Sequence, residues 1–284
     1  MPYQTLISVE QLQQLLQQGQ PVVLVDCRFE LADPAAGEAQ YAAGHLPSAV
    51  YAHLDRDLSS PITETSGRHP LPDADALAAK FASWGIDGSR QVVAYDSSGG
   101  AFASRLWWLA RWLGLRNVAV LDGGFAAWQA AGGELSQDTP TPTPTEFTAT
   151  PDHSLWVTSE QLATAVAEDS VVLVDARAPE RYRGEVEPID PVAGHVPGAL
   201  NLPHVQNLDD AGNYLPAQNL RTRFAPLFDH GHQVVHMCGS GVTACVNLLA
   251  SEHAGVSGAK LYAGSWSEWI RDTARPVESV GENH

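Results

Sequence analysis

Short runs of β-branched and aliphatic residues recur along the chain, and each run ends at a polar residue or a cysteine. The most regular runs are Val22–Asp26, Gln91–Asp96, Val171–Asp175 and Gln233–Cys238. Runs of this length that lack alternation are typical of parallel strands buried on both faces. They are far shorter than the apolar stretch needed to span a bilayer. We therefore predict four buried strands at these positions.

Helical spacing of apolar residues appears between the strand-like runs. Ser8 and Thr158 precede two of these segments as expected for N-caps, with Glu in the first turn. The helices predicted in this way cover Val9–Leu16, Ala74–Trp84, Ala101–Trp112, Phe125–Ala131, Ser159–Val166 and Thr243–His253. Alternating strands and helices predict an α/β fold, a doubly wound parallel sheet flanked by helices. In such folds the chemistry collects at the carboxyl ends of the strands.

The chain repeats itself, because four blocks of the first half return in the same order in the second half. Val-Val-Leu-Val-Asp occurs in both halves, and Gly-His-Leu-Pro of the first half corresponds to Gly-His-Val-Pro of the second. Gln91–Asp96 corresponds to Gln233–Cys238, and Leu121–Phe125 corresponds to Tyr262–Trp266. We expect two tandem copies of one fold.

A boundary between the copies is predicted at Asp138–Thr145, where Thr and Pro alternate. Proline fixes φ and favours an extended, semi-rigid connector. The sequence thus predicts a first domain over residues 1–137, a Pro/Thr-rich linker over 138–152 and a second domain over 153–284.

The formal net charge of −17 changes the list of expected partners. So acidic a chain repels nucleic acid and anionic lipid, and we expect neither as a partner. The N-terminus has no basic segment followed by an apolar one, so we expect no secretory signal. We therefore expect a cytoplasmic location. Three cysteines, an odd number without a C-x-x-C pair, predict reactive or buried thiols rather than disulfides or a metal site.

The chemistry-bearing candidate is a glycine-containing loop that joins a strand to a helix and begins at Cys238. Gly239 and Gly241 let the backbone curl so that successive N–H groups point inward. The helix that follows adds unpaired N–H donors and its positive dipole end. A cysteine at this place is expected to be held as a thiolate, and a persulfide would be stabilised by the same donors. The remaining loop residues, Ser240, Val242 and Thr243, are predicted to line the site.

The repeat supplies an internal comparison for this cysteine. The equivalent loop of the first copy starts at Asp96 and has no thiol, so only the second copy is chemically equipped. Cys27 corresponds to Ala176 and is interpreted as core filler. Cys245 is expected on the packed face of the helix and is interpreted as structural.

The loop sequence Cys-Gly-Ser-Gly-Val-Thr at 238–243 resembles the active loop of 3-mercaptopyruvate sulfurtransferases, members of the rhodanese superfamily. The motifs at 174–177, 194–199 and 264–269 resemble the flanking motifs of the same family, as do 105–108 and 121–125 in the first copy. Thiosulfate-preferring members usually carry basic side chains at the positions of Gly239 and Ser240. The resemblance therefore implies a carboxylate-bearing thiol donor.

The same resemblance implies roles for individual residues. Arg181 matches the family's substrate-binding arginine. The mercaptopyruvate branch usually has a second arginine shortly afterwards, but Glu185–Pro191 contains none, and Arg183 is the candidate for compensation. Ser240 and His69 match a proposed proton relay.

The acid of that relay is Asp57 or Asp55. In the implied mechanism the Cys238 thiolate takes sulfur from 3-mercaptopyruvate and releases pyruvate, and thioredoxin, a small thiol or cyanide then removes the sulfur. No cofactor and no metal are implied.

Three other functions are weighed against this one. A thiosulfate:cyanide sulfurtransferase would use the same cysteine. A non-enzymatic rhodanese-type binding module would describe the first copy but not the second. A phosphatase or arsenate reductase loop requires arginine where Ala244 stands, which disfavours that function.

Overall fold

The computed structural model describes residues 2–229 and 231–279, and their contacts divide the chain into two compact units. Besides its main part, each unit includes one short segment from the opposite half of the sequence. The first unit comprises the residues up to Ser60, Leu71–Asp152 and Leu208–Tyr214, and the second comprises Pro61–Pro70, His153–Asn207 and the residues from Leu215 onward. The repeat does not predict this exchange.

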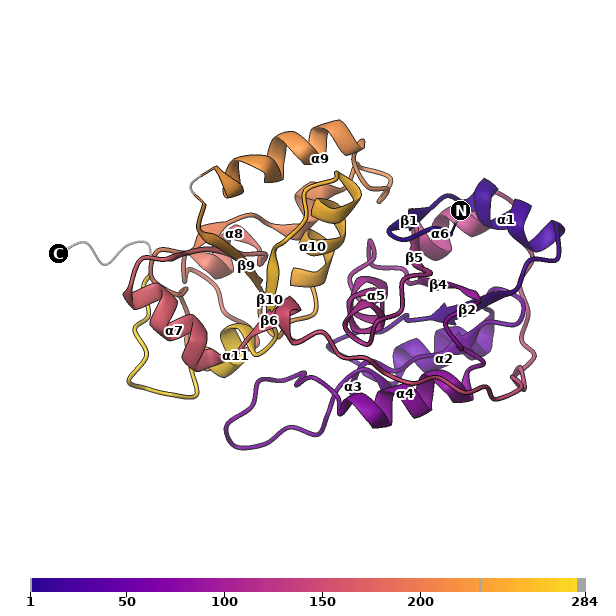
Figure 1. Ribbon diagram of the computed structural model, residues 1–284, viewed down its shortest axis with the longest axis horizontal. Helices are drawn as coiled ribbons and strands as arrows, with labels where there is room; N and C mark the ends of the chain where they lie inside the picture. The colour runs from indigo at the N-terminus through magenta and orange to yellow at the C-terminus, as the bar shows by residue number, and fades with distance from the viewer. Residues whose placement is uncertain (1, 230, 280–284) are drawn as a thin grey trace. The chain divides into compact units, whose positions relative to one another are not determined.

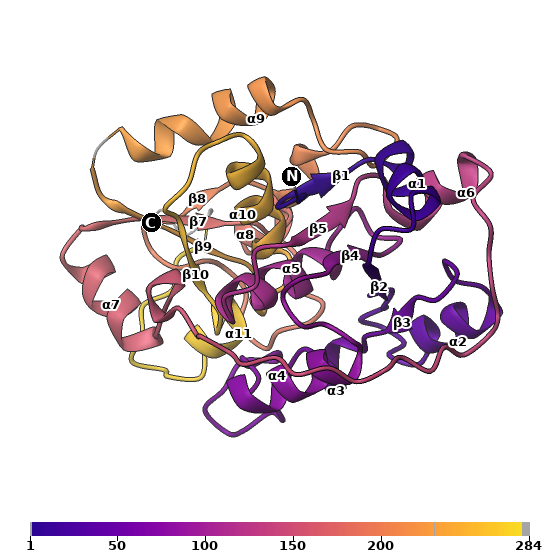
Figure 2. The same cartoon turned by 45° about the vertical axis from the view of Figure 1, so that its right-hand side comes forward.

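The first unit is built on a parallel five-stranded sheet in the order β1-β5-β4-β2-β3 (Figure 1, Figure 2). Its strands are β1 (Leu6–Ile7), β2 (Val22–Asp26), β3 (Val50–Tyr51), β4 (Gln91–Tyr95) and β5 (Val118–Leu121). The pairing of β2 with β4 runs in register from Val22 opposite Gln91 to Asp26 opposite Tyr95. Both predicted strands of this half are confirmed, and β4 is the central strand.

Among the described residues of this unit, six helices accompany the sheet, and four of them were predicted. They are α1 (Val9–Gln17), α2 (Ala36–Ala43), α3 (Leu54–Asp57), α4 (Ala74–Ser83), α5 (Ala103–Trp112) and α6 (Gly124–Ala130). Ser8 is confirmed as the N-cap of α1, because its side chain accepts a hydrogen bond from the Gln11 N–H while the Gln11 side chain bonds back to Ser8. This reciprocal capping box satisfies two N–H groups that would otherwise lack partners.

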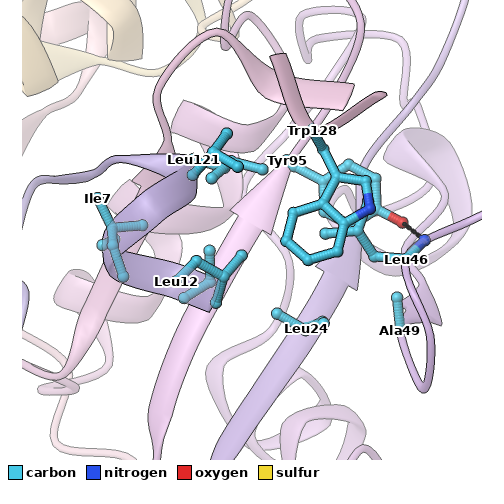
Figure 3. Close-up of a cluster of buried hydrophobic side chains, with 11 residues drawn as sticks. Ile7, Leu12, Leu24, Leu46, Ala49, Tyr95, Leu121 and Trp128 are labelled. Atoms are coloured by element: carbon cyan, nitrogen blue, oxygen red, sulfur yellow. Dashed lines mark hydrogen bonds between the residues drawn. The ribbon is translucent and has the colours of Figure 1, made fainter. Parts of the chain in front are cut away.

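One face of the sheet packs against α1 and α6 to form an apolar core (Figure 3). Leu24 and Leu121 from the strands meet Leu12 of α1 and Trp128 of α6, all of them buried. The Tyr95 hydroxyl lies in the same cluster, where it accepts a hydrogen bond from the Leu46 N–H at 3.1 Å. Burial of each large apolar side chain contributes about 1.5–3 kcal/mol, which fixes this face of the sheet.

The second unit repeats the topology with a parallel sheet in the order β6-β10-β9-β7-β8. Its strands are β6 (Trp156–Val157), β7 (Val171–Asp175), β8 (Leu200–Asn201), β9 (Gln233–Met237) and β10 (Lys260–Tyr262). The identical strand order confirms that the two halves are copies of one doubly wound fold. The central strand here is β9, which ends immediately before Cys238.

The helices of the second unit cover both faces of its sheet. They are α7 (Ser159–Ala167), α8 (Pro179–Tyr182), α9 (Ala217–Phe224), α10 (Ala244–His253) and α11 (Ser265–Trp269), with 3-10 turns at His153–Leu155, His204–Asn207 and Ala225–Phe228. Side chains alternate along β9: Val235 and Met237 join the core cluster formed with Leu162 of α7 and with Trp266 and Trp269 of α11. Val234 and His236 therefore face the opposite side of the sheet.

The proline-rich segment has no helix or regular strand, as its composition predicts. Its backbone is nevertheless anchored, since the N–H groups of Thr145, Thr150 and Asp152 donate to carbonyls of Ala82, Leu113 and Trp112. All of these residues belong to the first unit. Within the described part of the chain, no helix is long and apolar enough to cross a membrane.

Candidate active site

The loop that begins at Cys238 is fastened to the start of α11. The Cys238 N–H donates to the Ser265 hydroxyl at 3.1 Å, and the Cys238 carbonyl accepts from the Trp266 N–H at 3.0 Å. The Gly239 carbonyl accepts from the Ser267 N–H at 2.9 Å. These bonds place the thiol at the carboxyl end of the central strand, with its side chain 1% exposed.

Gly241 is required by the geometry of the loop. Its φ is +76°, a region that side-chain-bearing residues rarely adopt. A Cβ atom at this position would lie well inside contact distance of the Ala263 carbonyl oxygen. The loop therefore reaches α10 through a turn that only glycine can make, and the buried Val242 and then Thr243, the N-cap residue of α10, follow it.

The first unit shows what an anion does in the equivalent loop. Asp96 follows β4 and is buried, and its carboxylate accepts hydrogen bonds from the N–H groups of Ser98 and Gly100 at 2.8 and 2.9 Å, and of Phe102 and Ala103 at 2.8 and 2.9 Å. Burial raises the pKa of Asp96, and the four N–H donors oppose that shift. The loop of the first copy is thus filled by the chain's own carboxylate.

Two predicted relay residues meet in the second unit. The Ser240 hydroxyl lies 2.7 Å from Nδ1 of His69, and both side chains are buried. His69 is brought to this position because the Pro61–Pro70 segment belongs to the second unit. The pair can pass a proton, whichever of the two atoms donates.

Asp57, the predicted acid, lies at the end of α3 in the first unit. Its Oδ1 pairs with the Lys80 ammonium at 2.8 Å, and its Oδ2 accepts from the His53 N–H at 2.8 Å. Both oxygens of Asp57 are therefore engaged inside its own unit. The Asp55 N–H donates to the His53 ring at 3.1 Å.

Arg181 lies beside the loop and is held by two carboxylates. Its Nε and Nη2 donate to the Glu187 carboxylate at 3.2 and 2.7 Å, and Nη2 also lies 3.3 Å from Oδ2 of Asp190. Burial alone would raise the pKa of Glu187, but the bonds from Arg181 and from the Asp190 and Ile189 N–H groups hold it below its usual range. Arg181 is thus fixed in orientation rather than free at the surface.

Arg183 and the other two cysteines lie apart from this chemistry. Arg183 forms an exposed ion pair with Glu185 at 2.7 Å. Cys245 is buried, and its thiol donates to the Gly241 carbonyl at 3.4 Å. Cys27 is also buried, and burial raises its pKa well above the usual range. A buried thiol held neutral is unreactive, which agrees with the interpretation of Cys27 as filler.

Arg68 is a residue that the sequence analysis missed. It pairs with Oδ1 of Asp190 through Nη1, and its Nη2 lies 2.8 Å from the place where a Cβ of Gly239 would be. Nothing in the sequence around Arg68 indicates this position, except that it precedes the predicted relay residue His69.

Comparisons with known proteins identify the family. The rhodanese-like domain family matches residues 8–131 and 158–272. A Pseudomonas aeruginosa protein named "Probable 3-mercaptopyruvate sulfurtransferase" is 48% identical over 277 residues, which cover 96% of this chain and 97% of that protein. The thiosulfate sulfurtransferase of Cricetulus griseus is 32% identical over 291 residues, covering 99% of this chain and 96% of the relative.

Solved structures agree with the sequence matches. The 3-mercaptopyruvate sulfurtransferase from Leishmania major superposes with a TM-score of 0.81 at 30% identity, covering 94% of this chain and 74% of that one. The first matched segment contains β2 to β5, the second contains the corresponding strands β7 to β10, and the second also carries the cysteine loop. The chain therefore belongs to the rhodanese-like family of sulfurtransferases and consists of two tandem rhodanese-like domains.

Proposed function

We propose that the protein is a 3-mercaptopyruvate sulfurtransferase that carries sulfur as a persulfide on Cys238. The observation that carries this proposal is the pairing of an uncharged cysteine loop with a guanidinium beside it. Gly239 and Ser240 bring no positive charge to the sulfur, whereas Arg181 lies close to Gly239. A donor with its negative charge several bonds from the sulfur fits this arrangement better than a compact dianion does.

The first half-reaction forms a sulfur–sulfur bond at Cys238. The thiolate attacks the sulfur of 3-mercaptopyruvate, the bond from that sulfur to carbon breaks, and its electron pair leaves as the enolate of pyruvate. Protonation of the enolate carbon gives pyruvate and leaves Cys238 as a persulfide. Inward N–H donors and the start of α10 would stabilise both anionic sulfur species.

The second half-reaction returns the enzyme to its starting state. A thiol acceptor, such as thioredoxin or a small thiol, attacks the outer sulfur as its thiolate, and Cys238 leaves as a thiolate. Cyanide would take the same sulfur to give thiocyanate. Neither step requires an organic cofactor or a metal.

Ser240 and His69 are assigned the handling of protons at the donor. Their 2.7 Å contact supports a relay in which the serine hydroxyl donates its proton toward the developing enolate while the imidazole donates a proton to the serine oxygen. We assign the orienting acid to Asp57 or Asp55.

Thiosulfate is the second candidate donor, because a relative that covers nearly the whole chain is a thiosulfate sulfurtransferase. It would load the same cysteine but would release sulfite instead of pyruvate. The first domain, whose loop is filled by Asp96, is assigned a non-catalytic role in either case.

The test is to incubate the purified protein with 3-mercaptopyruvate and to follow both products. Intact mass should increase by one sulfur atom, tryptic peptides should place that atom on Cys238, and one pyruvate should be released for each persulfide. The Cys238→Ser variant is the control. A protein that gains sulfur from thiosulfate but not from 3-mercaptopyruvate would contradict the proposal.

A further inference from the structure

We infer that Arg68 is a specificity-determining residue, the second guanidinium that binds the donor carboxylate together with Arg181. We further infer that Asp190 occupies these two arginines until the donor arrives. The inference rests on the proposed function and adds to it how the donor is chosen. Arg68 and Arg181 are called the two-arginine site below.

The two arginines already share a carboxylate. Oδ1 of Asp190 pairs with Arg68, and Oδ2 lies 3.3 Å from Arg181, so one carboxylate bridges two guanidinium groups. The Asp190 side chain is only 4% exposed there. A site that holds the carboxylate of Asp190 in this way has the charge and shape to hold the carboxylate of a small organic acid.

Both arginines also direct nitrogen atoms toward the cysteine loop. Measured from the place where a Cβ of Gly239 would be, Nη2 of Arg68 lies at 2.8 Å, and the two terminal nitrogens of Arg181 lie at 3.6 and 3.7 Å. Gly239 directly follows Cys238. A guanidinium has five N–H donors, so donors remain beyond those that bind the acidic partners. The arginine side chains are 22% and 17% exposed and are reachable from solvent.

The acidic partners differ in how firmly they are held. Glu187 accepts from Arg181, from Arg177 and from the N–H groups of Ile189 and Asp190. Asp190 has only the two guanidinium groups as side-chain partners in the described residues. Glu187 is therefore the fixed counter-ion, and Asp190 is the carboxylate that a donor can displace.

Charge balance explains why displacement of the Asp190 carboxylate by the donor carboxylate would favour binding. The two arginines are neutralised by Glu187 and Asp190, so the site has no excess positive charge before the donor binds. Exchange of one carboxylate for another keeps the site neutral, which limits the desolvation cost of adding a charge. A dianion such as thiosulfate would leave an uncompensated negative charge in the same exchange.

The position of Arg68 also affects what position 239 can carry. A Cβ there would lie 2.8 Å from Nη2 of Arg68, closer than real Cβ contacts allow, so the end of the Arg68 side chain would have to shift. A basic side chain at 239 would therefore displace the Arg68 guanidinium from its present place. In this chain the positive charge comes from the Pro61–Pro70 segment instead of from the loop.

The main test measures steady-state kinetics for Arg68→Ala and Arg68→Lys with 3-mercaptopyruvate. Arg68→Ala should raise KM about 10- to 100-fold, because a charge-assisted bond to the carboxylate is lost, while kcat changes much less. Arg68→Lys should recover part of the loss. The control is Arg56→Ala, which removes an exposed ion pair with Glu38 in the first unit and should leave KM unchanged. An unchanged KM in folded Arg68→Ala would overturn the inference.

A second variant tests the displacement of Asp190. Asp190→Asn keeps the size of the side chain and removes its charge, so pyruvate, used as an unreactive carboxylate probe, should inhibit about 3- to 10-fold more strongly. The KM for 3-mercaptopyruvate should fall by a similar factor. If Asp190 only held the arginines in place, both constants would rise instead, and that result would overturn its assignment.

Persulfide formation separates the two possible failures. When 3-mercaptopyruvate is saturating, Cys238 of Arg68→Ala should still gain one sulfur atom. If the unmodified protein gains none, the proposed function and this inference fail together. If the unmodified protein gains sulfur and Arg68→Ala shows an unaltered KM, only the inference fails.

Discussion

Cys238 and Asp96 follow the central strands of the two sheets, and the difference between them decides what each loop can hold. The carboxylate of Asp96 reaches into its own loop and takes four N–H donors. A cysteine at this position is shorter and carries no oxygen atoms, and we propose that the N–H groups of its loop bind a transferred sulfur instead. On this proposal, one side chain separates a loop filled by its own carboxylate from a loop that carries sulfur.

Replacement of the nucleophile is the most direct test at the residue scale. Cys238→Ser should abolish sulfur transfer, because a serine hydroxyl does not ionise near neutral pH and cannot replace the thiolate. Circular dichroism and thermal unfolding should show the fold retained. Cys27→Ser and Cys245→Ser serve as matched controls, since both lie buried and should at most lower stability. More than trace activity in purified Cys238→Ser would refute the assignment.

Arg181→Ala should weaken turnover of 3-mercaptopyruvate far more than it alters the fold. Loss of a bidentate bond to the carboxylate costs about 1.5–3 kcal/mol, which corresponds to roughly 10- to 150-fold in kcat/KM. Initial-rate kinetics give the value, and Arg183→Ala is the comparison, because Arg183 forms an exposed pair with Glu185. If Arg183→Ala has the larger effect, the carboxylate is bound elsewhere.

His236 lies on the face of β9 that points away from α7 and α11, and its protonation makes the free energy of unfolding depend on pH. It is fully buried, neither ring nitrogen has a hydrogen-bond partner among the described residues, and burial followed by the nearby Arg223 lowers its pKa to about 3. In the unfolded chain the His236 ring binds a proton as pH falls through 6.5, whereas in the folded protein it stays neutral until pH approaches 3. The contribution of His236 to the free energy of unfolding is therefore retained above pH 6.5 and declines as pH falls from 6.5 toward 3.

Urea unfolding at pH 7 and pH 5 measures this effect. The unmodified protein should lose about 2 kcal/mol more between these pH values than His236→Leu, in which no group titrates at this position. The difference between the two proteins is the decisive quantity, because other groups titrate equally in both. Equal losses would show that His236 is not the group responsible.

At the scale of elements, the sequence predicts what local patterns determine. Strands β2, β4, β7 and β9 were predictable because apolar runs that end in polar residues are typical of buried strands. The N-caps Ser8 and Thr158 were predictable because capping is a local hydrogen bond, and both form full capping boxes. Helix α2 was missed because its alanine and glycine residues give almost no amphipathic pattern.

The site was predictable only where one stretch of chain carries it. Cys238 and its loop follow from the strand, glycines and helix around them, whereas the roles of Ser240 and Arg181 came from resemblance to a family. The geometry at Arg68 depends on the Pro61–Pro70 segment joining the second unit, which no local pattern encodes. For the same reason the sequence could name His69 only through resemblance to a family. Asp190 gave no signal, because its role depends on two arginines that lie 122 and 9 positions away.

The turn at Gly241 gives a prediction about the loop as an element. Gly241→Ala should lower the free energy of unfolding by about 2–4 kcal/mol, since it combines a positive φ with a clash against the Ala263 carbonyl. Gly198→Ala is the matched control, with φ of +74° but no atom within 4 Å of the added carbon, and should cost about 1 kcal/mol. Urea unfolding and persulfide yield would be measured for both. Equal costs would show that the loop can relax around a side chain.

At the scale of the whole molecule, we propose that this acidic protein binds its negatively charged donor through a few local cations. The net charge of −17 opposes the approach of every anion, and opposes a dianion more than a monoanion. The cations placed beside Gly239, Arg68 and Arg181, are themselves neutralised by acidic neighbours. Charge at both scales therefore disfavours thiosulfate.

Donor preference tests this argument for the molecule as a whole. We expect 3-mercaptopyruvate to exceed thiosulfate in kcat/KM by at least about tenfold, which needs only ~1.4 kcal/mol of differential transition-state binding.

Gly239→Arg with Ser240→Lys should shift the preference toward thiosulfate, because positive charge then lies next to the sulfur. The shift should be larger when Arg68→Ala is added, since that change also removes a guanidinium proposed to bind the carboxylate of 3-mercaptopyruvate. Initial rates with both donors under identical acceptor conditions measure all of these ratios. If the unmodified enzyme already prefers thiosulfate, neutral loop side chains do not select the donor, and the segment Glu185–Pro191, which lacks an arginine, is the better guide to specificity.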